Sequence, residues 1–120
     1  MGACFSVEME LHFSDEKATK KMMRDFIMER NGDSVAFDIM GKNLDDLDTL
    51  VKVFLTNHNY CRVGNVFKAD FNASYGWEIV LMDMFRTIAP TLQDGSRIYI
   101  EPDNDYDLLI IENGKVVIRH

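Results

Sequence analysis

The segment from Phe5 to Phe13 alternates apolar and polar side chains without a fault. Its apolar members are Phe5, Val7, Met9, Leu11 and Phe13, and the residues between them are Ser6, Glu8, Glu10 and His12. A strict period of two is typical of a strand with one face on a core and the other toward water. A sheet that contains such a strand is covered by helices on one face only, so the chain is expected to adopt an α+β fold.

Three later segments have the 3.6-residue periodicity of amphipathic helices. The first begins after Ser14, a candidate N-cap, and we expect a left-handed stop at Asn31-Gly32. The second begins after Asn43, and the third runs from about Gly76 to Ala89. The expected buried arcs consist of Ala18, Met22, Met23, Phe26 and Ile27, then Leu44, Leu47, Leu50, Val51, Phe54 and Leu55, and finally Trp77, Val80, Leu81, Met84, Phe85 and Ile88.

Strand patterns fill most of the remaining chain. A short alternating segment surrounds Val35, Phe37 and Ile39, and Gly64-Asn65 predicts a hairpin turn within residues 60–71, with a single bent strand as the alternative. Further strands are predicted at 97–101, 107–112 and 115–119, the last two joined by a type I′ turn at Asn113-Gly114.

The sequence predicts a single α+β domain over residues 1–120. We expect a two-layer sandwich: a mainly antiparallel sheet of about five to six strands, with three helices mostly on one face. A ferredoxin-like arrangement of the first half is one option, because the sequence leaves the strand order open.

Both faces of the last predicted hairpin carry apolar side chains. Leu109 and Ile111 share one face with Val116 and Ile118, and Leu108 and Ile110 share the other with Val117 and Arg119. The strand 107–112 is therefore expected to be central, and a helix, a loop or a partner chain should cover the second face.

Composition limits the classes of partner. The net charge of −7 disfavours nucleic acid, because that affinity comes largely from Lys and Arg. No stretch approaches the roughly 18 consecutive apolar residues of a membrane span, and we interpret the myristoylation-type pattern Met1-Gly2…Ser6 as a chance match. The only cysteines, Cys4 and Cys61, form no CxxC pair, which favours a reducing, cytoplasmic compartment.

The common catalytic and nucleotide-binding motifs are absent from the sequence. Glu8, Glu10 and His12 share a strand face that could hold a metal or relay a proton, but a solvated face is the favoured interpretation. Asp103, Asp105 and Asp107 have the spacing that opens a calcium loop, which then lacks the required Gly and Glu at its later positions. We therefore expect no catalytic residue, no cofactor and no metal, and leave weak divalent-ion binding at this loop open.

Eight methionines in this chain are a surplus, and some lie off the expected core arcs. Met28, Met82 and Ile79 are the candidate partner-binding residues, because exposed methionine suits adaptable interfaces. The partner would be another protein or a second copy of this chain.

The leading functional hypothesis is a small acidic protein-binding module with an inhibitory or regulatory role. A small-molecule-binding domain or minor enzyme is the alternative, with a pocket between sheet and helices lined by His12, Trp77 and Tyr99. A third is an acidic nucleic-acid mimic, which would use Asp45, Asp46 and Asp48. An enzyme is the less favoured class.

Overall fold

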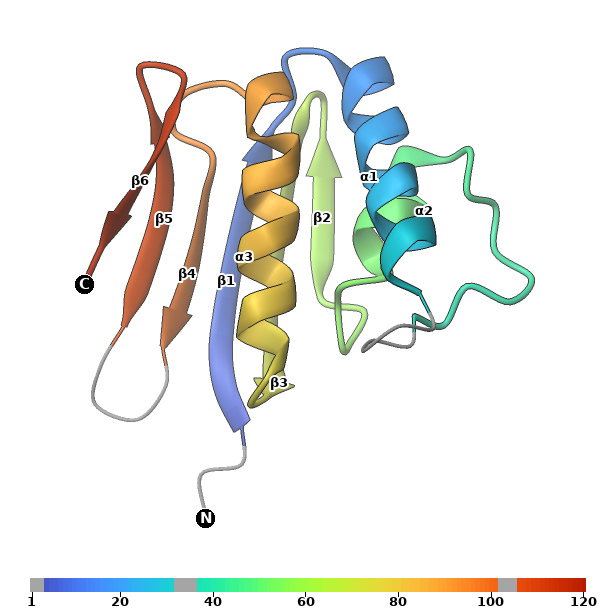
Figure 1. The fold of residues 1–120 in the computed structure, drawn as a ribbon, viewed down its shortest axis with the longest axis horizontal. Helices are drawn as coiled ribbons and strands as arrows, with labels where there is room; N and C mark the ends of the chain where they lie inside the picture. The colour runs from blue at the N-terminus through green and yellow to red at the C-terminus, as the bar shows by residue number, and fades with distance from the viewer. Residues whose placement is uncertain (1–3, 32–36, 102–105) are drawn as a thin grey trace.

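The computed structural model describes residues 4–31, 37–101 and 106–120 (Figure 1). Its elements, in chain order, are β1 (Cys4–His12), α1 (Glu16–Arg30), α2 (Leu47–Lys52), β2 (Tyr60–Val63), β3 (Val66–Ser74), α3 (Trp77–Ile88), the 3₁₀ turn η1 (Ala89–Thr91), β4 (Arg97–Glu101), β5 (Asp107–Glu112) and β6 (Lys115–Arg119). Within these ranges, no helix combines the length and the apolar character that crossing a bilayer requires.

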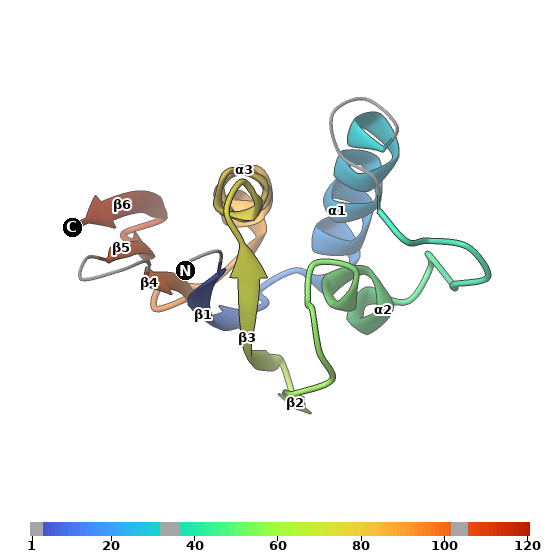
Figure 2. The same cartoon turned by 90° about the horizontal axis from the view of Figure 1, so that it is seen from below.

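The strands form one six-stranded sheet in the order β2-β3-β1-β4-β5-β6, and every neighbouring pair is antiparallel. The described helices lie on the same face of it (Figures 1 and 2). The predicted α+β two-layer architecture is therefore confirmed. The strand order β2-β3-β1-β4, with α1 and α3 as crossovers, is that of the ferredoxin-like β-α-β-β-α-β motif, and the β5–β6 hairpin widens the sheet beyond β4.

The alternation of β1 is confirmed, and it organises the core. The strand pairs with β3 on one side and β4 on the other, and its apolar side chains are buried beneath the helices. The neighbouring strands and helices complete a single cluster with Phe67, Phe71, Ile98, Ile100, Leu109 and Ile111 from the sheet, and Met23, Ile27, Leu50, Leu81, Phe85 and Ile88 from the helices.

The ends of α1 differ from the predicted ones. Asp15 rather than Ser14 is the N-cap, because its Oδ1 accepts a hydrogen bond from the Ala18 amide at 3.1 Å. The Ser14 hydroxyl instead donates to the Thr91 carbonyl. The helix ends at the expected place, and Asn31 has an extended backbone with φ −68°, so the left-handed residue predicted for Asn31-Gly32 is not Asn31. Its partner in that prediction, Gly32, lies outside the described residues.

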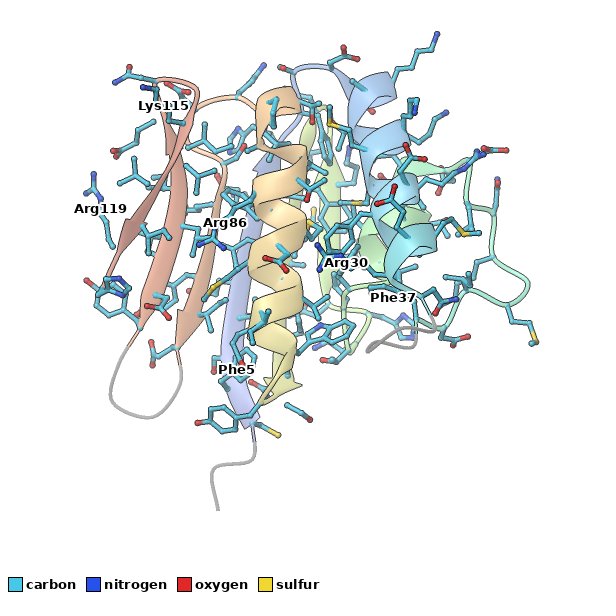
Figure 3. The ribbon with its side chains drawn as sticks, viewed as in Figure 1. Phe5, Arg30, Phe37, Arg86, Lys115 and Arg119 are labelled. Atoms are coloured by element: carbon cyan, nitrogen blue, oxygen red, sulfur yellow. The ribbon has the colours of Figure 1, made fainter. Side chains whose placement is uncertain are left out.

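The strand predicted around Phe37 and Ile39 is wrong, and Val35 lies outside the described residues. Phe37 is buried in an aromatic cluster above the sheet, with ring-centroid distances of 5.4 Å to Phe54 and 5.8 Å to Trp77. Figure 3 shows Phe37 near the end of α1, on the helix side of the molecule. Its apolar character therefore serves packing between helices rather than pairing in the sheet.

Helix α2 is shorter than its sequence pattern. Asp46, not Asn43, is its N-cap and accepts a hydrogen bond from the Thr49 amide at 3.0 Å. Asn43 forms a local turn instead, with its Oδ1 accepting from the Asp45 amide at 3.0 Å. Of the predicted stripe, Leu44 and Leu55 lie outside the helix and are only partly buried.

Both predicted hairpin turns are confirmed. Gly64 has φ 58° between β2 and β3, and Asn113 and Gly114 have φ 54° and 76° between β5 and β6. Two successive positive φ values define the type I′ turn. The Asp94 carboxylate accepts hydrogen bonds from the Asn113 and Gly114 amides at 2.8 and 2.9 Å, which fixes this turn against the loop before β4.

The Gly114→Ala variant should lower the free energy of unfolding by about 1 kcal/mol, because an L side chain is strained at positive φ. A Cβ at this position would meet nothing within 4 Å, so the effect isolates backbone strain from steric clash. Urea denaturation measures it. Asn113→Gly is the matched control and should be nearly neutral; equal stability of Gly114→Ala and the wild type would contradict the assigned turn.

Candidate functional site

The face of the sheet opposite the helices, here called the open face, carries the side chains that alternate with the core residues. The cross-strand register arranges them in rows that run across the strands. The acidic row consists of Asp70, Glu8, Tyr99, Leu108 and Arg119, and the ion-paired row consists of Cys61, Lys68, Glu10, Arg97, Ile110 and Val117. The two rows bring together residues from β2, β3, β1, β4, β5 and β6.

The ion-paired row is neutralised around Glu10. The Glu10 carboxylate lies 2.6 Å from His12 Nε2, 3.2 Å from an Arg97 guanidinium nitrogen and 3.8 Å from Lys68 Nζ. Its side chain is only 19% exposed. The hydrogen bond with His12, helped by the Arg97 and Lys68 cations and opposed by burial, lowers the pKa of Glu10. Glu10 therefore contributes to the stability of the sheet as an anion.

Among the described residues, the two acids of the acidic row, Glu8 and Asp70, have no such neutralisation. Glu8 and Asp70 lie directly opposite each other on β1 and β3. In the described part of the chain, neither carboxylate has an ion pair or a side-chain hydrogen bond. Like charges directly opposite each other destabilise an antiparallel pair. The fold thus keeps two adjacent anions without a counter-charge.

A shallow hollow of about 460 Å³ lies over these two rows. Its lining residues are Glu8, Met9, Glu10, Asn59, Tyr60, Cys61, Lys68, Ala69, Asp70, Arg97, Tyr99 and Leu108. Tyr99 is fixed at one side, because its ring stacks on Tyr106 with centroids 5.4 Å apart and its hydroxyl hydrogen-bonds to Glu101 at 2.9 Å. The bond to Glu101 and the surrounding negative charge raise the pKa of Tyr99, so the phenol is neutral at physiological pH.

An apolar strip continues the open face beyond the hollow. Leu108, Ile110 and Val117 are neighbours on β5 and β6 and are partly exposed. The inner faces of the same strands bury Leu109 and Ile111, so the predicted apolar character of both faces of the hairpin is present. β5 has strand neighbours on both sides, as expected. The described helices leave its open face uncovered (Figure 2).

The candidate pocket residues lie on opposite faces of the sheet. His12 and Tyr99 belong to the open face. Trp77 lies at the start of α3, where its indole Nε1–H donates to the Phe54 carbonyl at 3.0 Å and its ring packs in the aromatic cluster. The structure therefore does not bring Trp77 to the other two, and it assigns this side chain a packing role.

The candidate partner-binding residues do not form one patch. Met28 and Ile79 are 55% and 62% exposed, whereas Met82 is partly buried against the core. Arg30 on α1 reaches Asp83 on α3 at 3.0 Å, and Figure 3 shows Arg30 between the two helices. Met28 precedes Arg30 by two residues, which is more than half a turn, so it lies on the side of α1 away from α3.

The acids of the proposed nucleic-acid mimic have intramolecular partners. Asp45 pairs with Arg24 at 2.8 Å, Asp46 caps α2, and Asp48 pairs with Arg62. Arg62 also reaches Glu16 at 2.5 Å, which ties β2 to both α1 and α2. Asp48 and Glu16 therefore help to hold the helices on the sheet, and Asp45 and Asp46 have local structural roles.

Metal ligands do not cluster within the described residues, where no group of three or more His, Cys, Asp and Glu side chains could hold an ion. In the acidic loop, Asp103 and Asp105 lie outside the described residues. The third acid, Asp107, is on β5 and lies 2.6 Å from His120 Nδ1. The calcium hypothesis is therefore untested at its first two positions.

The sequence interpretation missed Lys68, Asp70 and Arg97. The alternation of residues 66–74 was a usable signal, because its polar members fall at every second position. Their approach to Glu8 and Glu10 depends on the pairing of β1 with both β3 and β4, which local patterns do not specify.

Substitutions of Glu10 and Glu8 should have different effects on the free energy of unfolding, because one carboxylate is neutralised and, among the described residues, the other is not. Glu10→Gln should lower the free energy of unfolding by about 1 kcal/mol at pH 7, because it breaks a partly buried charge network. A carboxyl with a lowered pKa stabilises the fold above its unfolded pKa and loses that contribution as the pH falls through the folded value. The difference between the wild type and Glu10→Gln should therefore shrink below about pH 4.

Glu8→Gln is the matched control for this measurement. It should leave stability unchanged or raise it by up to about 0.5 kcal/mol, since it removes a like-charge opposition. Denaturant titrations of both variants at several pH values provide the data. Equal destabilisation by the two variants would contradict the assignment of neutralised and uncompensated rows.

Aspartate substitutions should distinguish Ile79 from Met82. Ile79→Asp should change the free energy of unfolding by less than about 0.5 kcal/mol, because the side chain is exposed. Met82→Asp should lower it by about 1 to 3 kcal/mol, because the carboxylate would replace an apolar contact with the core. Thermal or urea unfolding measures both, and a neutral Met82→Asp would instead place this residue at the surface.

No protein-family model, curated protein or solved structure matches this chain. Its function is therefore inferred from the chemistry of its own surfaces.

Proposed function

We propose that this chain is a protein-binding module and that the open face is its binding surface. The observation that carries the proposal is the apolar strip of Leu108, Ile110 and Val117, which continues a charged hollow on a sheet face that the described helices leave uncovered. Apolar surface bordered by polar side chains is typical of protein interaction sites.

The composition of β5 supports this assignment. A strand that only separates a core from water carries polar residues at every second position, as β1 does with Ser6, Glu8 and Glu10. β5 instead carries Leu108 and Ile110 at its outward positions. Covering such side chains contributes roughly 25 cal/mol per Å² of apolar area removed from water, so this part of the face favours a partner.

The charges beside the strip supply specificity. Glu10, Arg97 and Lys68 belong to one ion-pair network, so a partner meets groups of both charges side by side. Complementary charge increases the rate and the selectivity of association more than the affinity. An inhibitory or regulatory role, acting by occupying a partner's surface, fits this arrangement.

A small-molecule-binding role is the second candidate. The volume of the hollow, about 460 Å³, is sufficient for a small ligand. The hollow is shallow, whereas ligand pockets usually enclose most of the surface of the ligand. A protein segment that extends from the hollow to the apolar strip uses more of this face.

The test uses a display library of random 12-residue peptides as the probe, with selection against the wild-type protein. The double variant Leu108→Thr/Ile110→Thr places β-branched side chains, which suit a strand, at both positions while removing apolar surface. Selected peptides should bind it at least tenfold more weakly than the wild type, as measured by isothermal titration calorimetry. The affinity for Ile79→Thr, the control on the helix face, should be unchanged.

Two results would contradict the proposal: no enrichment of any peptide, or enriched peptides that bind the double variant as tightly as the wild type. Peptides weakened only by Ile79→Thr would move the binding surface to α3. The free energies of unfolding of both variants, measured in parallel, exclude loss of the fold as the cause.

A further inference from the structure

We propose that the partner of the open face inserts a basic side chain, Arg or Lys, between Glu8 and Asp70, and places an apolar side chain about three residues away on the strip of Leu108, Ile110 and Val117. This inference rests on the proposed function, because it specifies the chemistry of the partner that binds the same face. It combines the uncompensated charge of the acidic row with the geometry of the sheet.

The charge argument comes from the contrast between the two rows. Glu10 in the ion-paired row has three cationic or protonatable neighbours, whereas Glu8 and Asp70 in the acidic row have no ion pair among the described residues. Lys68 and Arg97, the basic residues that line the same hollow, are directed to Glu10. Among the described residues, no basic side chain pairs with this exposed acidic pair, so a basic group of a partner can reach it.

The spacing of the acidic pair suits one guanidinium group. Directly opposed residues of an antiparallel pair have Cβ atoms about 4.5 to 5.5 Å apart, so a planar group with several donors can reach both carboxylates at once. Arg presents such a fork, and Lys presents a point charge that satisfies the same pair less specifically.

The neighbours of the pair complete a site for a cation. Tyr99 lies beside Glu8 in the register, and an aromatic ring favours a nearby cation. Its hydroxyl is engaged by Glu101 and does not compete for the Glu8 carboxylate. On the other side, Asn59 borders the hollow next to Asp70, whose amide donates to the Asn59 carbonyl at 3.2 Å.

The sheet geometry predicts the spacing within the partner. Leu108 is two strands away from Glu8 along the acidic row. Neighbouring strands are about 4.8 Å apart, so the separation is about 10 Å, which an extended peptide that crosses the strands spans in about three residues. The expected pattern is a basic residue followed or preceded by an apolar residue at the third position.

The net charge of the chain favours the same partner. At −7, the protein attracts basic segments over a distance and repels acidic ones. The attraction is screened by salt, so the affinity should fall as the ionic strength rises.

The experiment continues the peptide selection with two matched double variants. Glu8→Gln/Asp70→Asn removes the acidic pair, and Asp25→Asn/Glu29→Gln removes the same number of charges from the exposed surface of α1. Peptides enriched on the wild type should share Arg or Lys with an apolar residue three positions away. Replacing that Arg by citrulline, which is neutral and of similar shape, should weaken binding to the wild type at least tenfold.

The double-mutant cycle then assigns the contact. On Glu8→Gln/Asp70→Asn, the citrulline peptide should bind within about twofold of the Arg peptide, whereas Asp25→Asn/Glu29→Gln should keep the full difference. Peptides that depend on Leu108 and Ile110 but contain no basic residue, or ignore the acidic pair, would overturn this inference and leave the proposed function standing. Peptides whose affinity is unchanged by substitutions in the strip and in the acidic pair would overturn this inference and the proposed function.

Discussion

The constraint on which the structure depends is the burial of one face of β1 in the middle of the sheet. Because β1 pairs with β3 and β4, its register fixes the register of both neighbours. A slip by one residue would move Glu8 and Glu10 into the core and expose Val7 and Met9. The same register that forms the core therefore also aligns the acidic and ion-paired rows on the open face. Core and candidate site are two consequences of one alternating segment.

Much of this fold could be predicted because local patterns and tertiary burial agree. The period of two in β1, the turn at Asn113-Gly114 and the apolar arc of α3 each specify an element without knowledge of its neighbours. The predictions fail where the tertiary environment decides. Large apolar residues alternate with Ala36 and Asp38 around Phe37, as in a strand, but the Phe37 ring packs against Phe54 and Trp77. At the start of α1, the adjacent residues Ser14 and Asp15 are both suitable N-caps. The Ser14 hydroxyl donates to the Thr91 carbonyl, and Asp15 is the N-cap.

Only part of the candidate site could be predicted, because its residues come together through the strand order, which local patterns do not specify. The outward stripe of β1 and the apolar outer face of β5 are visible in the sequence. The cations that neutralise Glu10 are not, because Arg97 is 87 residues away along the chain and approaches only through the order β3-β1-β4. The grouping of His12 and Tyr99 with Trp77 failed on the same point. Which face of a sheet a helix covers depends on the crossover connections, and these place Trp77 on the side opposite the open face.

The two rows of the open face show different uses of charge on one surface. In the ion-paired row, Lys68 and Arg97 neutralise an anion and strengthen the pairing of three strands. In the acidic row, Glu8 and Asp70 repel each other across the same strands, so they oppose the stability of the fold. A protein tolerates such a local violation most readily where a function uses it. A cation bound between the carboxylates would relieve this repulsion, which would add to the affinity for the proposed basic partner. Covering the apolar strip would contribute in the same direction, so both features that weaken the isolated domain would strengthen the proposed complex.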